Sequence, residues 1–341
     1  MSEPLLPWQP ASWAQVMQML DRFPHAVLLH GPHGIGKVRF GERLAQALLC
    51  EQPAPDGQPC GACLACGWVS QYAHPDYRRV RPENLEEAAA DDGDAEPAKG
   101  AKAVKTASKE IRIEQIRALA SFMNVSSHRR GRRVVLLHPA EALNAVSSNA
   151  LLKTLEEPPP DTVFILVSNN IDGLLPTILS RCRKVPLAPP DTAQALAWLK
   201  AQGVSDAESW LGEQGGAPLA ALEEAQSGGR EAIEALLAHL ARPAPESALK
   251  TADLLQKTPA ADVTAWTQRW LYDLFSVKFS GKIRYYPKYR REVDALAQRA
   301  DPRQLLAVLK RVNDRRAIAD HPLSAKLFIE DMLLDYSTVF A

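Results

Sequence analysis

Apolar residues in the first half of the chain gather in short runs that alternate with amphipathic stretches. Nearly continuous apolar runs of this length are typical of buried strands. The predicted strands cover residues 25–30, 78–80, 134–137, 162–167 and 184–187. The predicted helices, where apolar positions recur at helical spacing, cover residues 12–22, 39–49, 111–123, 144–157 and 174–180. Strands that alternate with helices predict an α/β domain whose parallel sheet is covered on both faces.

Strand patterns disappear after Pro189, and only helical patterns follow. A chain of 341 residues is long enough for two or three domains. The pattern predicts three of them: an α/β domain over residues 1–188, a small helical domain over residues 189–228 and an all-helical domain over residues 229–341.

One segment inside the α/β domain breaks the alternation. Residues 83–109 hold seven acidic residues in their first half and four lysines in their second, separated mainly by alanine and glycine. Such a sequence buries too little apolar surface to fold by itself. We expect a disordered surface insertion there, and we assign it no chemistry.

The composition narrows the class of protein. Hydrophobic residues make up 46% of the chain, and Lys+Arg and Asp+Glu number 40 each. This balance argues against a histone-like protein that coats polyanions, although local basic patches are compatible with it. No run reaches the roughly 18 apolar residues of a membrane span, and residues 1–4 lack the features of a secretory signal. We therefore expect a cytoplasmic protein without membrane contact, in which disulfides are rare.

A glycine-rich turn joins the first predicted strand to the helix after it. Gly31, Gly36 and Lys37 fit the spacing G-x-x-x-x-G-K, with Gly34 between them. Loops of this kind hold phosphates with backbone N–H groups, a helix N-terminus and the lysine. The next position should be Ser or Thr, whose hydroxyl holds Mg²⁺, but it is Val38. The context indicates descent from a nucleotide-binding loop, and the sequence leaves open whether ATP or ADP still binds.

The second element of a hydrolytic site is also altered. The strand at residues 134–137 should end in an Asp that orders Mg²⁺ and a Glu that activates water. It ends instead in His138 and Pro139, and Glu141 follows three residues after His138. Neither His138 nor Pro139 replaces a metal-organising carboxylate. We therefore expect metal-dependent hydrolysis to fail.

Four of the five cysteines are clustered in the sequence. Cys50, Cys60, Cys63 and Cys66 supply four thiolates within 17 residues. Zinc prefers four such ligands in a tetrahedron, and a site with four protein ligands is structural. Free buried cysteines, a redox pair and an iron–sulfur cluster are the alternatives. Cys182 lies far from the cluster in the sequence and is interpreted as a small buried side chain.

Two further segments carry a resemblance to a known family. Residues 148–159 and 175–182 resemble the signatures of bacterial clamp-loader AAA+ proteins, with Ser180-Arg181-Cys182 as the hallmark triplet. The resemblance extends from residue 8 to about residue 225. It implies an AAA+ P-loop-type domain with a zinc module, then a helical lid domain, then a helical collar domain that assembles a heteropentamer. It also favours Zn²⁺ at the cysteine cluster.

The altered motifs resemble the non-hydrolysing members of that family rather than its ATPases. The implied partners are the ATPase subunits (gamma/tau), the delta subunit and, through the complex, the sliding clamp and primer–template DNA. In that setting Arg181 would act in trans as an arginine finger at a neighbour's ATP. The alternative is that Arg181 caps a helix or pairs with an acid of its own chain.

Two more positions bear on the nucleotide site by the same resemblance. Asn169 stands where the family's ATPases sense the γ-phosphate, and it is interpreted as a relic. Leu219 stands where those ATPases carry a lid arginine. Two competing hypotheses stay open: an active ATPase of the gamma/tau kind with atypical residues, supported by Gly36 and Lys37, and a scaffold in which neither ATP nor Arg181 matters.

Two basic segments could contact nucleic acid. Residues 277–291 interleave lysine and arginine with aromatic residues, a pattern that suits stacking on bases. Residues 129–133 form a basic turn. We favour the simpler interpretation, in which the tyrosines of the first segment pack locally and both segments are otherwise solvated.

Overall fold

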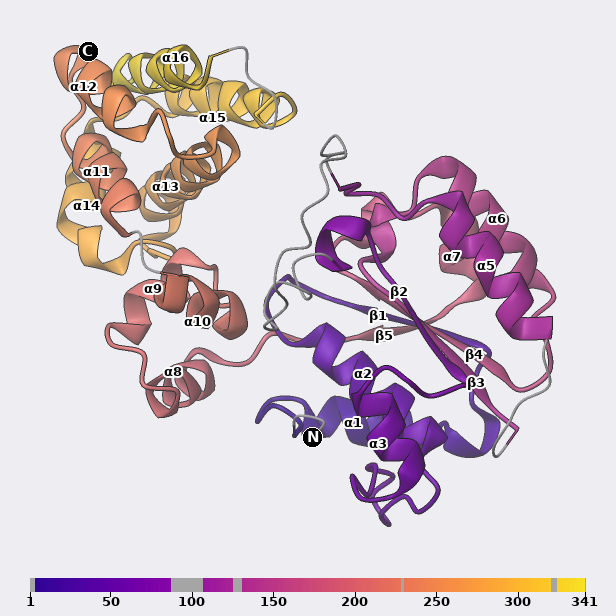
Figure 1. Ribbon diagram of the computed structural model, residues 1–341. Helices are drawn as coiled ribbons and strands as arrows, with labels where there is room; N and C mark the ends of the chain where they lie inside the picture. The colour runs from indigo at the N-terminus through magenta and orange to yellow at the C-terminus, as the bar shows by residue number, and fades with distance from the viewer. Residues whose placement is uncertain (1–3, 87–106, 125–130, 228–229, 320–323, 341) are drawn as a thin grey trace, which may run out of the picture. The chain divides into compact units, whose positions relative to one another are not determined.

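The structure is a computed structural model that describes residues 4–86, 107–124, 131–227, 230–319 and 324–340 (Figure 1). The chain forms two compact units, residues 1–190 and residues 191–341. Most of the predicted insertion at residues 83–109 and part of the basic turn at residues 129–133 lie outside the described residues.

The first unit is built on a five-stranded parallel sheet with the strand order β2-β3-β4-β1-β5. The strands are β1 (Ala26–His30), β2 (Tyr77–Val80), β3 (Arg133–Leu137), β4 (Thr162–Ser168) and β5 (Arg183–Pro186). Every residue of β3 and β4 is buried, as expected for central strands of a sheet covered on both faces. The predicted α/β fold with a parallel sheet is confirmed.

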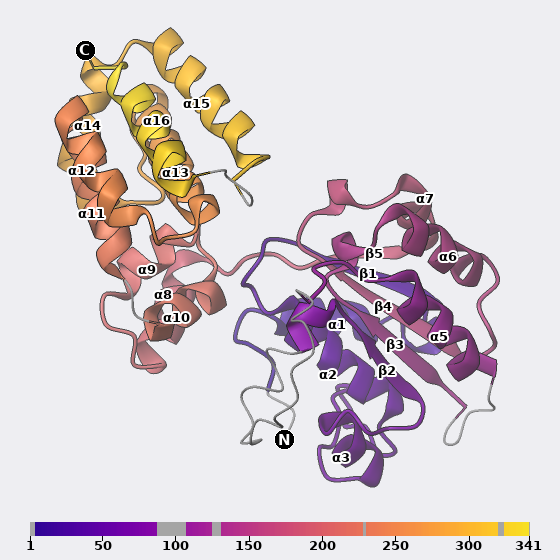
Figure 2. The same cartoon turned by 45° about the horizontal axis from the view of Figure 1, so that its top comes forward.

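Helices cover the two faces of this sheet (Figures 1 and 2). The helical elements of the unit are α1 (Pro10–Met17), η1 (Leu20–Arg22), α2 (Lys37–Leu49), α3 (Leu64–Ser70), α5 (Ile113–Asn124), η2 (Ala140–Ala142), α6 (Ala145–Glu156), η3 (Ile171–Gly173) and α7 (Pro176–Arg181). Alternate residues of a strand point to opposite faces. On β1, Val27 and Leu29 join the core under α1 and α2, whereas Ala26 and Leu28 join the core under α5, α6 and α7.

The second unit is helical throughout its described residues. Its elements are α8 (Thr192–Ala201), α9 (Ala207–Glu213), α10 (Pro218–Ser227), α11 (Arg230–Ala241), α12 (Pro245–Leu255), α13 (Ala260–Ser280), η4 (Pro287–Tyr289), α14 (Arg290–Arg299), α15 (Pro302–Arg316) and α16 (Ala325–Ser337). One hydrophobic cluster lies among α8, α9 and α10, and a larger one lies among the later helices. The division of this unit into a lid and a collar stays a prediction.

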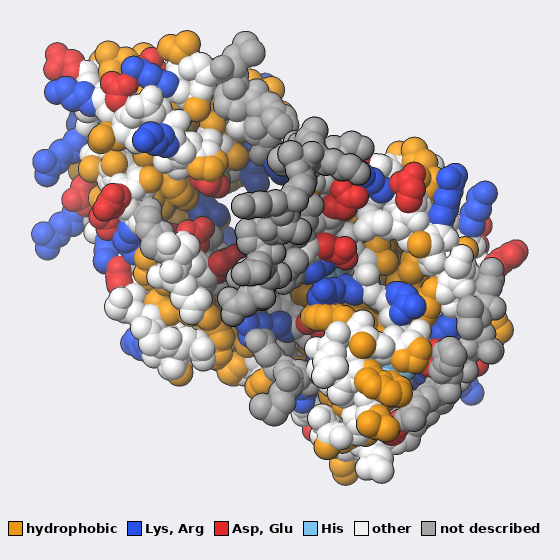
Figure 3. Space-filling model, viewed as in Figure 1, with side chains coloured by type: hydrophobic (Ala, Val, Ile, Leu, Met, Phe, Trp, Pro, Cys, Tyr) orange, Lys and Arg blue, Asp and Glu red, His pale blue; other side chains and the backbone are white. Residues whose placement is uncertain are grey.

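The surface of each unit mixes both signs of charge. On the face shown in Figure 3, Lys and Arg side chains are interspersed with Asp and Glu. Among the described residues, no helix has the length and apolar character needed to cross a membrane.

The tyrosines of the segment at residues 277–291 pack within their own unit. The buried carboxylate of Asp273 accepts hydrogen bonds from the backbone N–H groups of residues 284–286, at 2.8 to 3.1 Å. Tyr286 is 2% exposed, and its hydroxyl donates to the carbonyl of Trp266. The buried carboxylate of Asp273 and the packing of Tyr286 therefore stabilise the conformation of this segment.

We predict that Asp273→Ala lowers the free energy of unfolding by about 2–4 kcal/mol, because it leaves backbone N–H groups without their acceptor. Chemical denaturation of the full chain measures the loss, and hydrogen exchange should speed up at residues 284–286. Asp273→Asn, which keeps one acceptor oxygen, should cost less. Asp314→Ala, on an exposed position of α15, is the control. Equal effects of the Asp273→Ala and Asp314→Ala changes would contradict the role of the buried carboxylate.

Candidate functional site

The glycine-rich turn lies between β1 and α2, as the sequence predicts. Gly34 and Gly36 have φ of 73° and 86°, a left-handed conformation that glycine adopts without strain. Gly31 is required by space, because a Cβ there would lie 2.4 Å from the carbonyl oxygen of Leu187. The loop therefore has the backbone of a phosphate-binding turn, with the N-terminus of α2 at its end.

Lys37 lies inside this loop rather than in solvent. It is 4% exposed, and its Nζ donates to the carbonyl oxygen of Pro32 at 2.5 Å. Burial lowers the pKa of Lys37 to about 8, an effect partly offset by the negative charge of Glu141. The ammonium group thus lies within the loop and bonds the loop's own backbone.

A segment near the N-terminus supports the loop from outside. The amide of Gln9 donates to the carbonyl oxygen of Gly36 at 2.9 Å, and the indole N–H of Trp8 donates to that of Ile35 at 2.9 Å. Gln9 is 3% exposed. Sequence reasoning missed both residues, since nothing in their local pattern points to a partner 27 residues away.

His138 directly follows β3, where a metal-organising carboxylate would stand. It is 7% exposed, and its Nε2 has no hydrogen-bond partner among the described residues. Burial lowers the pKa of His138 to about 4, and the positive charges of Arg79 and Arg81 act in the same direction. A neutral imidazole under the influence of two arginines supplies no negative charge for Mg²⁺.

Glu141 stands closer to the site than its sequence position suggests. One of its carboxylate oxygens accepts a hydrogen bond from the backbone N–H of Asn169 at 2.9 Å. The other oxygen is buried without a hydrogen-bond partner among the described residues. Glu141 also acts electrostatically on Lys37. The carboxylate of Glu141 therefore bonds the backbone after β4 and interacts electrostatically with Lys37. Its position in the sequence, three residues after His138, does not indicate either interaction.

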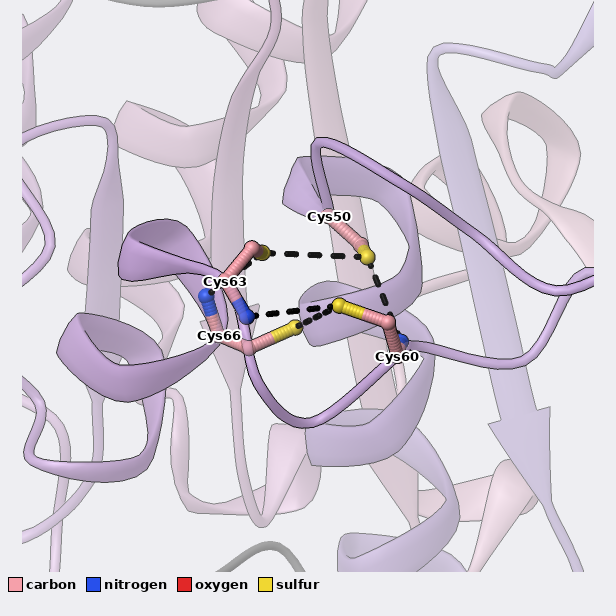
Figure 4. Close-up of side chains that lie close together, drawn as sticks. All are labelled: Cys50, Cys60, Cys63 and Cys66. Carbon is pink, nitrogen blue, oxygen red and sulfur yellow. Dashed lines mark hydrogen bonds between the residues drawn. The ribbon is translucent and has the colours of Figure 1, made fainter.

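The four clustered cysteines come together in space (Figure 4). Their Sγ atoms all lie within 4.8 Å of one another. Cys50 follows the last residue of α2, Cys63 caps the N-terminus of α3, and Cys66 lies in its first turn. The Sγ atoms of Cys50 and Cys63 are 4.0 Å apart, as are those of Cys60 and Cys66.

This arrangement fits a metal ion with four thiolate ligands. Zn–S bonds of about 2.3 Å in a tetrahedron place the sulfurs about 3.8 Å apart, close to the two separations of 4.0 Å. Hydrogen bonds from the backbone N–H groups of Ala62 and Cys63 lower the pKa of the Cys60 thiol to about 6. Burial raises the pKa values of the Cys50 and Cys66 thiols. The cluster can hold a metal, with every ligand supplied by the protein.

Arg181 is the last residue of α7 and is partly exposed. Its Nη1 donates to the carbonyl oxygen of Thr177 at 3.0 Å and to the Ser180 hydroxyl at 3.3 Å. Its Nη2 donates to a carboxylate oxygen of Glu156 at 2.5 Å. The guanidinium group is therefore paired within its own chain. Cys182, next to it, lies in the core, where burial raises the pKa of its thiol to about 11.

The residues predicted from the sequence as site residues lie in separate parts of the structure. The phosphate loop, His138 and Asn169 follow the carboxyl ends of β1, β3 and β4, which share one edge of the parallel sheet. The cysteine cluster lies between α2 and α3. Leu219 lies on α10 in the second unit and offers no charge.

Comparison with known proteins connects these features to one family. Residues 9–191 match the family described as DNA polymerase III, delta subunit. The chain belongs to this family.

The relatives found include DNA polymerase III subunit delta' proteins of two bacteria. The chain is 40% identical to that of Pseudomonas aeruginosa over 232 residues, which cover 67% of this chain and 63% of the relative. It is 32% identical to that of Haemophilus influenzae over 229 residues, which cover 66% of this chain and 62% of the relative. The matches thus span less than two thirds of these relatives' length. A crystal structure of a DNA polymerase III gamma subunit-related protein from Thermotoga maritima aligns over 97% of this chain and 100% of its own, with 18% identity and a TM-score of 0.44.

We predict that the purified chain carries about one Zn²⁺ held by the four cysteines. Cys60→Ser should remove most of the metal, because it takes away one of four thiolate ligands. Elemental analysis by mass spectrometry measures the content. Cys182→Ser, which removes a buried thiol outside the cluster, is the matched control and should leave the metal in place. Iron in place of zinc would show that the zinc assignment is wrong.

We also predict that the imidazole of His138 stays neutral down to a pH of about 4 in the folded chain. Its pKa lies below the ordinary value of 6.5, so the unfolded chain binds more protons between these two values and stability falls as the pH drops from 6.5 to 4. NMR titration of the ring resonances measures the pKa, and His138→Gln should reduce the acid sensitivity of unfolding. A His138 resonance that titrates near pH 6.5 would contradict this prediction.

Proposed function

We propose that this chain is a non-hydrolysing subunit of the delta' kind in a clamp loader of DNA polymerase III, where it supplies Arg181 to the ATP site of a neighbouring subunit. One observation carries the proposal. The chain places a partly exposed arginine at the end of α7, while the Mg²⁺ position of its own loop site is held by a neutral, buried histidine. The names of the relatives supply the setting.

The chain's own chemistry supports the absence of hydrolysis. Val38 has no hydroxyl to hold Mg²⁺, and His138 supplies no carboxylate. Glu141 has one carboxylate oxygen engaged by the backbone N–H of Asn169. Lys37 remains in a loop with the backbone of a phosphate site. The chain can therefore lack hydrolysis and still keep groups that bind the phosphates of ATP or ADP.

Arg181 has the properties that an arginine finger needs. Its charge is permanent, and its planar donors match the oxygens of a phosphate. It uses three acceptors in its own chain, whereas a guanidinium group carries five N–H donors. Donors therefore remain for a phosphate presented from outside, where an arginine stabilises the charge of the transition state.

The remaining parts of the chain have structural or assembly roles in this proposal. Zn²⁺ at the cysteine cluster would tie the end of α2 to the start of α3. Residues 229–341 would form the collar of a heteropentamer with gamma/tau ATPase subunits and delta. The complex would load the sliding clamp on primer–template DNA in the cytoplasm.

We predict that Arg181→Ala lowers ATP turnover at the neighbouring site by about three orders of magnitude, with assembly intact. The measurement is single-turnover hydrolysis in a reconstituted complex whose other ATPase subunits carry substitutions of their own phosphate-loop lysines. The control is Arg183→Ala, which removes an exposed arginine two residues away. Turnover that stays unchanged in the Arg181→Ala complex would exclude the role in trans.

The second candidate function is an active ATPase of the gamma/tau kind, which the buried Lys37 and the nearby Glu141 favour. We expect the isolated chain to show no Mg²⁺-dependent hydrolysis, because its Mg²⁺ ligands are missing. Phosphate release measured with and without Mg²⁺ tests this. Turnover that needs Mg²⁺ and disappears in Lys37→Ala would instead support the second candidate.

A further inference from the structure

Glu156 connects the two segments that carry the family signatures. It is the last residue of α6, and Arg181 is the last residue of α7. Their side chains meet with an N–O separation of 2.5 Å. The carboxylate therefore contacts the same guanidinium group that the proposed function assigns to a neighbour's phosphate.

The position of Glu156 is unfavourable for α6 itself. The carboxyl end of a helix carries a partial negative charge, so an acidic residue there is destabilising and a basic residue is stabilising. Glu156 and Glu157 both stand at this end of α6, and only Glu156 bonds the arginine among the described residues. The contact with Arg181, which is itself favourably placed at the end of α7, offsets the repulsion at Glu156.

The ion pair between Arg181 and Glu156 is weak enough to break readily. The side chains of Arg181 and Glu156 are 32% and 49% exposed, so water competes for both. Exposed ion pairs of this kind shift an equilibrium by a factor of only about two to five. Such a contact is too weak to hold two helices together, but it is strong enough to orient one side chain.

The carboxylate and a phosphate would compete for the positive charge of the same guanidinium group and for its Nη2. Nη1 of Arg181 is bonded to Thr177 and Ser180 of its own helix, whereas Nη2 bonds only Glu156 among the described residues. A phosphate oxygen that approached from another subunit would replace the carboxylate at Nη2 and leave the contacts of Nη1 intact. The guanidinium group would then exchange one anion for another with little movement.

We propose that Glu156 is a positioning residue that holds Arg181 on its own chain until a phosphate of the neighbouring subunit displaces it. This inference rests on the proposed function of Arg181. It predicts that the carboxylate lowers the availability of the arginine, so that its removal helps engagement with ATP rather than hindering it.

The first experiment uses the isolated chain and does not depend on that function. Phenylglyoxal modifies free guanidinium groups, and mass spectrometry of peptides gives the rate at Arg181. Glu156→Gln should raise this rate about two- to fivefold. Glu157→Gln removes the same charge from the next position and should not change it, and the rate at Arg183 reports any loss of folding. Equal rates in wild type and Glu156→Gln would overturn the proposal.

The second experiment uses the reconstituted complex. Glu156→Gln should raise kcat/KM for ATP at the neighbouring site about two- to fivefold, because a more available arginine engages the phosphate more readily. This effect should vanish when Arg181→Ala is also present. A kcat/KM that does not rise, or an effect that persists in the double variant, would overturn the proposal. If Arg181→Ala alone changes nothing, the proposed function fails, while the labelling rates still decide whether Glu156 holds the arginine.

Discussion

The candidate nucleotide site depends on the central position of β1 in the parallel sheet. β1 pairs with β4 on one side and with β5 on the other, so that His30 lies opposite both Ser168 and Pro186. This register brings the start of the loop against the chain that leaves β5, and the close approach of Gly31 to the carbonyl of Leu187 follows from it. The sheet, together with the support from the N-terminal segment, therefore sets the shape of the loop.

The charges at this edge of the sheet bear on the proposal that the loop keeps its phosphate-binding groups while the chain does not hydrolyse ATP. Lys37 lies inside the loop, and Arg79 and Arg81 act electrostatically on the buried imidazole of His138. Glu141 is one nearby carboxylate, and part of its hydrogen-bonding capacity is used by a backbone N–H. Glu42 and Glu86 pair with Arg79 and Arg81. Positive charge of this kind attracts phosphate and repels a divalent cation. Under the proposed function, His138 therefore leaves the Mg²⁺ position without the negative charge that a divalent cation needs.

Much of the α/β unit could be predicted from the sequence, because buried strands and the phosphate loop are local patterns. The predicted strand over residues 162–167 corresponds to Thr162–Ser168, and the cysteine spacing alone identified a cluster that closes in space. Helix α3 was not predicted, since it is short and begins at a cysteine within a glycine- and proline-rich stretch. The contacts of Gln9 and Glu141 were missed for a different reason, because they join residues about 27 positions apart.

The candidate nucleotide site and the proposed arginine finger reside on different elements, so that one can change without the other. Val38 lies in the first turn of α2 and His138 directly follows β3, whereas Arg181 is the last residue of α7. Helix α7 is fixed by Ile178, and the chain after it by Cys182, both in the core shared with α5 and α6. Substitutions at the Mg²⁺ position leave those contacts untouched. The presentation of Arg181 therefore depends on packing against α6, and its availability depends on the carboxylate at the end of that helix.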